Sequence, residues 1–243
     1  MPYTDTCIQS LNPGFSQLLS QVLYSQAELR PAILRALKVI VDANQSIAAG
    51  NFEKCPTTTL TPSDAQANLG FLRTQAESWL AVLFNVFGSV DRDSRGMVGD
   101  VITSWASVCG EEEVNKAYGK VIQLFKTNLA KTVQETARPN TTAQSEVANL
   151  TATAQDILVL LLPYMSKKDA QALFELCLTQ EVLSGKDNGI QKRGYKILAR
   201  LVEADKVQVE AEDALKRLDE LVAGLLPAAK KVRYRSFFCG FVS

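Results

Sequence analysis

The apolar residues of this 243-residue chain recur every three or four positions along nearly its whole length. This spacing places them on one side of a helix and is clear in residues 18–23, 33–41 and 80–87. No run of alternating β-branched residues is long enough to indicate a sheet. The pattern therefore predicts an all-α fold.

Nine helices are expected, and glycine, proline and capping residues mark where they begin and end. The expected helices cover about residues 14–25, 28–48, 63–87, 93–108, 112–135, 146–164, 167–184, 187–203 and 206–225. The candidate N-caps are Ser63 with Asp64 after Pro62, then Asp93 and Ser166, and the candidate ends are Gly50, Gly88, Gly110 and Gly185. Two longer polar stretches, 50–61 and 136–145, are expected to be exposed loops.

Short helices joined by tight turns favour stacked antiparallel hairpins over an ordinary bundle, which stays open as the alternative. Residues 29–40, 95–105 and 187–201 each resemble the second helix of a HEAT hairpin. In that pattern a basic residue near the helix start reaches back to an acidic or carbonyl group in the turn. A small residue then lets the neighbouring helix approach closely. The spacing leaves room for one unrecognised repeat, so we expect a HEAT-like solenoid over residues 1–243.

The residues needed for most enzyme chemistry are missing from the sequence. There is no histidine, which excludes Ser-His-Asp and Cys-His catalysis and histidine-ligated zinc. The five cysteines lack metal or redox spacing, and no glycine-rich phosphate loop is present. The acidic triplet 111–113 is interpreted as first-turn carboxylates favoured by the helix dipole. We expect no enzyme activity, cofactor or metal. An enzyme that uses carboxylates or lysine is the alternative, but the sequence contains no group of such residues that would support it.

Charge is balanced overall but clustered near the C-terminal end. Lys plus Arg and Asp plus Glu number 26 each. Lys192, Lys196 and Arg200 are spaced by four residues and share one helix face. Ile190, Ile197 and Leu201 lie on the other side of the helix. Such a ridge could contact RNA phosphates or an acidic partner, and the alternative is a solvated face balanced by the acidic stretch 203–220.

A second basic cluster precedes two phenylalanines at 237–238 and could bind RNA by phosphate contact and stacking. Its alternative is the start of another repeat helix. The candidate RNA- or partner-binding residues of the two clusters are Lys192, Arg193, Lys196, Arg200, Lys230, Lys231, Arg233 and Arg235.

Four blocks of sequence resemble the ribosomal RNA-processing protein 12 family of HEAT-repeat proteins. They are WLAVLFNVFG at 79–88, ILVLLLPY at 157–164, GIQKRGYKIL at 189–198 and PAAKK at 227–231. The third block is the most specific and resembles the family's GVQKKAYKVL-type helix. The resemblance spans about residues 15–235 and is sharp at about 76–231, whereas the tail 232–243 is atypical. Family members are several times longer, so the chain is expected to be an internal block.

The resemblance implies a non-catalytic scaffold in ribosome biogenesis. Such a protein supports pre-rRNA processing and the maturation and export of pre-ribosomal subunits through protein and RNA contacts. The implied partners are pre-ribosomal particles, pre-rRNA and assembly-factor proteins, with no membrane and no small-molecule substrate. The implied location is the nucleolus and nucleus, with shuttling to the cytoplasm as an option. The alternative is a HEAT-type protein-binding or nuclear-transport adaptor with no RNA role.

Overall fold

The computed structural model describes residues 13–53, 55–135, 141–183 and 187–208, and within them it contains helices and no strands. The α-helices are α2 (Pro13–Ser25), α3 (Arg30–Ala48), α4 (Pro62–Ser89), α5 (Arg95–Val108), α6 (Glu111–Glu135), α7 (Thr141–Leu161), α8 (Lys167–Cys177), α9 (Gln180–Leu183) and α10 (Asn188–Glu203). A 3-10 turn, η1 (Leu162–Tyr164), follows α7. The all-α prediction is confirmed. Most of the expected helix 206–225 lies outside the described residues, and residues 206–208 are not helical.

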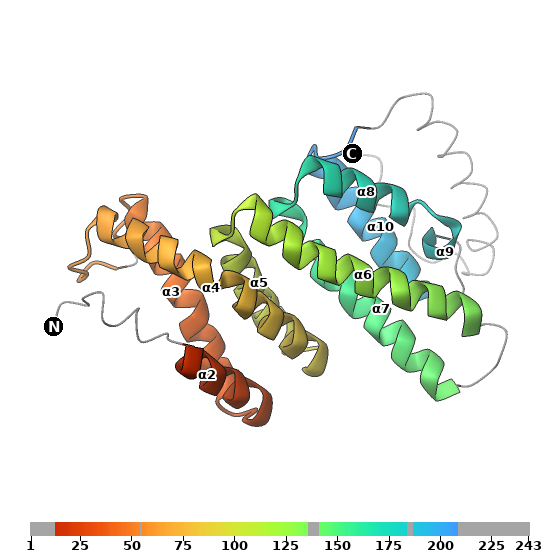
Figure 1. Cartoon of the computed structure of the whole chain (residues 1–243), viewed down its shortest axis with the longest axis horizontal. Coiled ribbons are helices and arrows are strands. Elements are labelled where there is room, and N and C mark those ends of the chain that lie inside the picture. Colours follow the sequence, from red (N-terminus) through yellow and green to blue (C-terminus); the bar gives the residue numbers. More distant parts are fainter. Residues whose placement is uncertain (1–12, 54, 136–140, 184–186, 209–243) are drawn as a thin grey trace, which may run out of the picture.

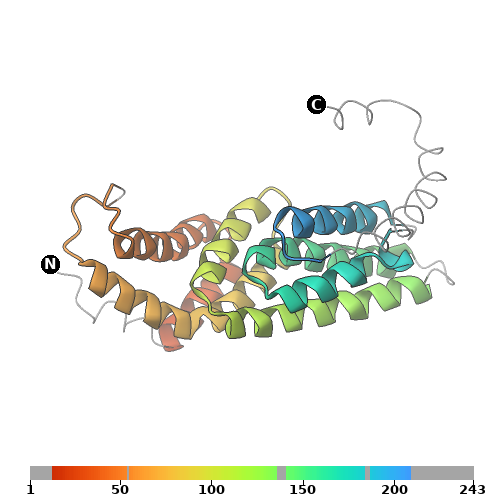
Figure 2. The ribbon, with the colours of Figure 1, turned by 90° about the horizontal axis from the view of Figure 1, so that it is seen from above.

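The helices form hairpins stacked in two layers along the long axis of the molecule (Figures 1 and 2). The first helices of the hairpins are α2, α4, α6 and α8, and the second helices are α3, α5, α7 and α10. The second helices pack in succession, α3 on α5, α5 on α7 and α7 on α10, while α2 packs on α4 and α4 on α6. In Figure 2, α3 and α10 lie on one side and α4 and α6 on the other. This two-layer stacking is a HEAT-like solenoid.

The three HEAT-like stretches of the sequence are all second helices of hairpins. Residues 29–40 fall on α3, residues 95–105 on α5 and residues 187–201 on α10. The repeat that the sequence did not reveal is the hairpin of α6 and α7. As expected, a basic residue reaches back in the first stretch, because the Arg30 guanidinium donates to the Leu23 carbonyl at 2.8 Å near the end of α2.

The starts of α4 and α5 differ from the sequence predictions. Helix α4 is capped by Thr61, whose hydroxyl accepts from the Asp64 backbone N–H while the Asp64 carboxylate accepts from the Thr61 N–H. The prediction of Ser63 with Asp64 was wrong because Pro62 is tolerated inside the first turn, where its missing N–H is not needed. The cap of α5 is Ser94 rather than Asp93 and makes no side-chain capping bond.

The remaining predicted helix caps and helix ends agree with the structure only in part. Ser166 caps α8 as predicted, by accepting from the Asp169 N–H at 3.1 Å. Gly50 follows the end of α3, whereas Gly88 lies inside α4, which continues to Ser89. Gly110 separates α5 from α6, and Gly185 lies outside the described residues.

Of the two predicted loops, one is a loop in the structure and the other is partly helical. Residues 50–61 form a non-helical connection between α3 and α4, as expected; residue 54 lies outside the described residues. The loop prediction was wrong for residues 141–145, because α7 begins at Thr141. Helix α7 packs along α6, and such packing extends a helix into residues whose own helix propensity is low. Residues 136–140 lie outside the described part.

Helix α7 occupies the middle of the second layer and ends in a long apolar run. By length and composition, Glu146–Tyr164 could cross a membrane, and 44% of the window is buried inside the structure. It contacts α5 on one side, α10 on the other and α6 from the first layer. This central position accounts for its apolar composition as that of a core helix.

Candidate nucleic-acid interface

Helix α10 carries the basic ridge predicted from the sequence, and its first turn is fixed by a cap. The Asp187 carboxylate accepts from the backbone N–H groups of Gly189 at 2.7 Å and Ile190 at 3.0 Å. Ile190 and Leu201 are buried against the rest of the solenoid. The cap and the buried face together determine which side of α10 meets solvent.

The exposed side of α10 presents three cations, which we name the α10 strip: Lys192, Lys196 and Arg200. Lys192 and Lys196 take part in no ion pair with another described residue, whereas Arg200 lies 3.4 Å from Glu203 in an exposed pair. Exposed pairs of this kind are weak, so Arg200 stays available to an external phosphate.

Arg193, the fourth candidate on α10, is turned away from the strip. Its Nε donates to Asp156 of α7 at 2.9 Å, and its Nη1 donates to the Gly189 carbonyl at 3.2 Å. The side chain is 32% exposed. The structure therefore places Arg193 at the joint between two helices and the other three cations in solvent.

Asp156 connects three second-layer helices and was missed by the sequence reasoning. Its other carboxylate oxygen lies 4.0 Å from the guanidinium of Arg95 on α5. Arg95 also lies over the ring of Phe87, 5.4 Å from its centre. One feature of the sequence could have pointed to Asp156, because it is the single acid within the largely apolar stretch 152–165.

Several other described cations near the solenoid surface are paired with acids, although exposed lysines of α6 and α8 are not. Between α4 and α6, Arg73 makes two bonds to Glu113, at 3.1 and 3.0 Å, and Lys120 lies 2.9 Å from Glu77. On α3, Lys38 pairs with Asp42 one turn away. The tail candidates Lys230, Lys231, Arg233 and Arg235 lie outside the described residues.

The acidic triplet 111–113 opens α6, as the sequence interpretation required. Glu112 pairs with Lys116 at 2.9 Å, and Glu113 pairs with Arg73. Hydrogen bonding to Arg73 lowers the pKa of Glu113 below its ordinary value. Among the described residues, no group of His, Cys, Asp or Glu is arranged to hold a metal ion.

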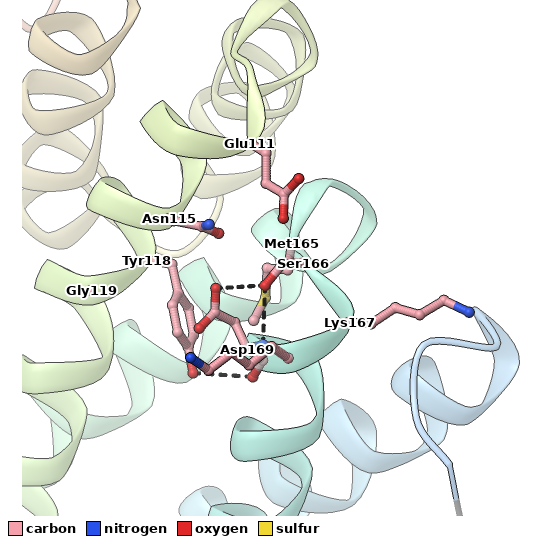
Figure 3. Close-up of a pocket in the computed structure, with 9 residues that line it drawn as sticks. Glu111, Asn115, Tyr118, Gly119, Met165, Ser166, Lys167 and Asp169 are labelled. Carbon is pink, nitrogen blue, oxygen red and sulfur yellow. Dashed lines mark hydrogen bonds between the residues drawn. The ribbon is translucent and has the colours of Figure 1, made fainter.

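A cavity of about 770 Å³ lies between α6 and the turn that leads into α8 (Figure 3). Tyr118 of α6 spans it by donating its hydroxyl to the Asp169 carbonyl at 3.4 Å, and burial raises the pKa of Tyr118 well above its ordinary value. Asn115 points toward the same space, whereas Lys167 extends away from it. The Asp169 carboxylate accepts from the Ser166 hydroxyl at 2.8 Å, which holds it at the start of α8.

Two thiols are made unreactive by burial. Cys177 is fully buried in α8, and burial raises its pKa to about 12. Burial has the same effect on Cys109, whose pKa also rises to about 12. Because the thiolate is the reactive form, both residues behave as small apolar side chains at neutral pH. Cys7 and Cys239 lie outside the described residues.

The fold and the surface define a class of protein: a HEAT-type helical solenoid with a row of cations on the exposed face of α10. Comparison with known proteins gives the family. Residues 4–90 match the family model of ribosomal RNA-processing protein 12, HEAT repeats. The chain is therefore a relative of the ribosomal RNA-processing protein 12 family, and the resemblance seen in the sequence is confirmed.

Two fungal proteins show the extent of this relationship. Ribosomal RNA-processing protein 12 of Saccharomyces cerevisiae is 30% identical over 198 residues, which is 80% of this chain and 16% of that protein. Putative ribosomal RNA-processing protein 12 of Schizosaccharomyces pombe is 29% identical over 211 residues, 85% of this chain and 17% of that protein. The chain thus spans about a sixth of the length of these relatives. No solved structure gives a significant match.

Proposed function

We propose that this chain acts in ribosome biogenesis as a non-catalytic scaffold. It supports pre-rRNA processing and the maturation and export of pre-ribosomal subunits in the nucleolus and nucleus. Its partners are pre-ribosomal particles, pre-rRNA and assembly-factor proteins. The proposal takes residues 1–243 as one repeat array. Support comes from the two relatives, whose names place them in ribosomal RNA processing.

The observation on which the RNA part of the proposal rests is the α10 strip on a solenoid related to these proteins. A solenoid offers a long surface on which proteins and RNA can bind at different places. Cations that point into solvent without a strong internal partner are suited to phosphate contacts. Lys192 and Lys196 meet this condition among the described residues and lie in one row with Arg200, which meets it in part. Among the same residues, other exposed lysines such as Lys126 and Lys168 also lack an acid partner but lie on different helices.

Sedimentation of the tagged full chain from cell extract tests the proposal, with each fraction probed for pre-rRNA. We expect the chain to migrate with pre-ribosomal particles and to leave them at high salt or after nuclease treatment. A variant with Lys192, Lys196 and Arg200 changed to Glu should shift toward the free protein. A control with the same charge change, Lys126, Lys131 and Lys168 to Glu, alters exposed lysines of α6 and α8 and should migrate like the wild type.

Migration of the wild-type chain only as a free small protein contradicts the proposal. Particle association that resists both nuclease treatment and the α10 substitutions would indicate a protein-binding adaptor without an RNA role. An equal effect of the α10 variant and the control variant would show that net charge, rather than the α10 strip, determines the association.

A further inference from the structure

We infer that the α10 strip binds the sugar–phosphate backbone of RNA without reading its bases. This inference rests on the proposed function and goes further, because it names the part of the RNA that is recognised. It follows from three properties of the strip: its length, the side chains around it and the charge of the neighbouring helices.

The strip is short and straight. Lys192 and Arg200 are eight residues apart on one helix, which corresponds to about 12 Å at a rise of 1.5 Å per residue. Lys196 lies midway, so the cations follow one another about every 6 Å. Three cations in one row can neutralise at most about three phosphates, because each binds as a separate charge.

The side chains around the strip are unsuited to base recognition. Proteins read RNA bases by stacking them on aromatic rings or guanidinium planes and by hydrogen bonds to their edges. The exposed residues of α10 between Lys192 and Glu203 include Ala199 and Val202 and no aromatic residue. Tyr195 is half-buried against the core. Without an aromatic platform to hold a base, these exposed cations favour phosphate contacts over base recognition.

Two guanidinium groups lie on or beside the strip, and they differ in how freely they face solvent. Arg193 is held by Asp156 and by the Gly189 carbonyl, so its plane does not face solvent as a free stacking surface. Arg200 keeps only a weak, exposed pair with Glu203 at 3.4 Å, so it gives the strip a single guanidinium plane, on which any base could stack because such stacking is tolerant of sequence. Lys192 and Lys196 have no plane on which a base could stack, and they act as point charges.

The neighbouring second-layer helices do not prolong the strip. Helix α7 contributes Asp156, which is engaged by two arginines, and half-buried apolar residues such as Val159. Helix α5 exposes an acid, Asp100. A phosphate chain that crossed from α10 toward α5 would therefore leave positive charge and approach negative charge. The strip therefore does not continue from α10 onto α7 or α5.

Fluorescence anisotropy with three labelled probes of equal length, oligo(U), oligo(C) and oligo(dT), tests the inference on the purified full chain. The test variant changes Lys192, Lys196 and Arg200 to Gln, and the control changes Lys126, Lys131 and Lys168 to Gln. We expect the test variant to weaken binding by the same factor, within about twofold, on all three probes. The slope of log affinity against log salt between 50 and 200 mM KCl should fall by about two, as for three phosphates on a single strand. The control should leave both unchanged.

The outcomes separate this inference from the function on which it rests. A loss that is much larger on one base, or on RNA than on DNA, overturns backbone-only recognition while RNA binding itself stands. If the test variant binds as tightly as the wild type, the α10 strip is not the RNA-binding surface, and RNA binding then belongs to another surface. Absence of binding to every probe contradicts the RNA part of the proposed function as well. Both variants retain residues 209–243, so any contribution of that segment cancels, and far-ultraviolet circular dichroism checks that they fold.

Discussion

At the scale of single residues, Asp156 has the most consequential position. Its carboxylate lies between Arg193 of α10 and Arg95 of α5, and its side chain is 26% exposed. The Nε of Arg95 is buried and has no hydrogen-bond partner among the described residues. Removing the negative charge would leave two partly buried guanidinium groups facing a neutral side chain, which is unfavourable.

Changing Asp156 to Asn should therefore lower the free energy of unfolding by about 1–3 kcal/mol, the range for leaving a buried hydrogen-bonding group without its partner. Urea unfolding followed by circular dichroism at 222 nm measures this. Glu112 to Gln is the matched control, because its pair with Lys116 is exposed and its loss should cost clearly less than the loss of the Asp156 charge. Equal losses for the two variants would show that Asp156 is no more important than a surface pair.

At the scale of elements, the end of α3 shows how backbone conformation terminates a helix. Gly50 has a φ of +74°, and its N–H donates to the Ile47 carbonyl at 2.9 Å. The Asn51 N–H donates to the Ser46 carbonyl at 2.9 Å, which completes a Schellman motif. A residue with a β-carbon is strained in this left-handed conformation even though the surrounding space is open.

Two glycine substitutions with open surroundings should thus have opposite effects. Gly50 to Ala should lower the free energy of unfolding by about 1 kcal/mol because of its positive φ. Gly70 to Ala, in the exposed interior of α4, should raise it by about 0.5–1 kcal/mol because alanine favours helix. Urea unfolding of both variants provides the comparison. Effects of the same sign would contradict this explanation of the α3 end.

At the scale of the whole molecule, the hairpins contact mainly their neighbours. Both tryptophans, Trp79 and Trp105, are buried in the hairpin of α4 and α5, with ring centres 5.8 Å apart. Helix α10 packs on α7, α8 and α9, at the other end of the described solenoid. In such a chain, stability is close to a sum of local hairpin terms and nearest-neighbour terms.

Gly194 to Ala should therefore separate two unfolding signals. Its new β-carbon would lie 2.5 Å from Cγ1 of the buried, branched Val182, so α10 must shift, at a cost of about 1–3 kcal/mol. We expect the urea midpoint to fall more by circular dichroism at 222 nm, which reports all helices, than by tryptophan fluorescence. Equal shifts by both probes would show that the described chain unfolds as one cooperative unit.

The parts of the fold that follow from local chemistry could be predicted from the sequence. Helix periodicity located the described helices to within a few residues, apart from the early start of α7 and the break between α8 and α9. Errors arose where a neighbouring residue or helix decides the outcome. Thr61 rather than Ser63 caps α4 because Pro62 fits the first turn, and α7 begins early along α6.

The candidate site divides in the same way. The spacing of Lys192, Lys196 and Arg200 puts them on one face of a helix. Ile190 and Leu201 lie on the opposite, apolar side. Because a helix with a single apolar side buries that side, the cationic face is the exposed one. The separate role of Arg193 depends on Asp156, 37 residues earlier in the chain. The sequence by itself determined the helices and the direction of the cationic face, since both follow from spacing along one helix. Only the tertiary structure decided which cation is internally paired and which helices flank the strip, because these depend on contacts between helices that sequence spacing does not encode.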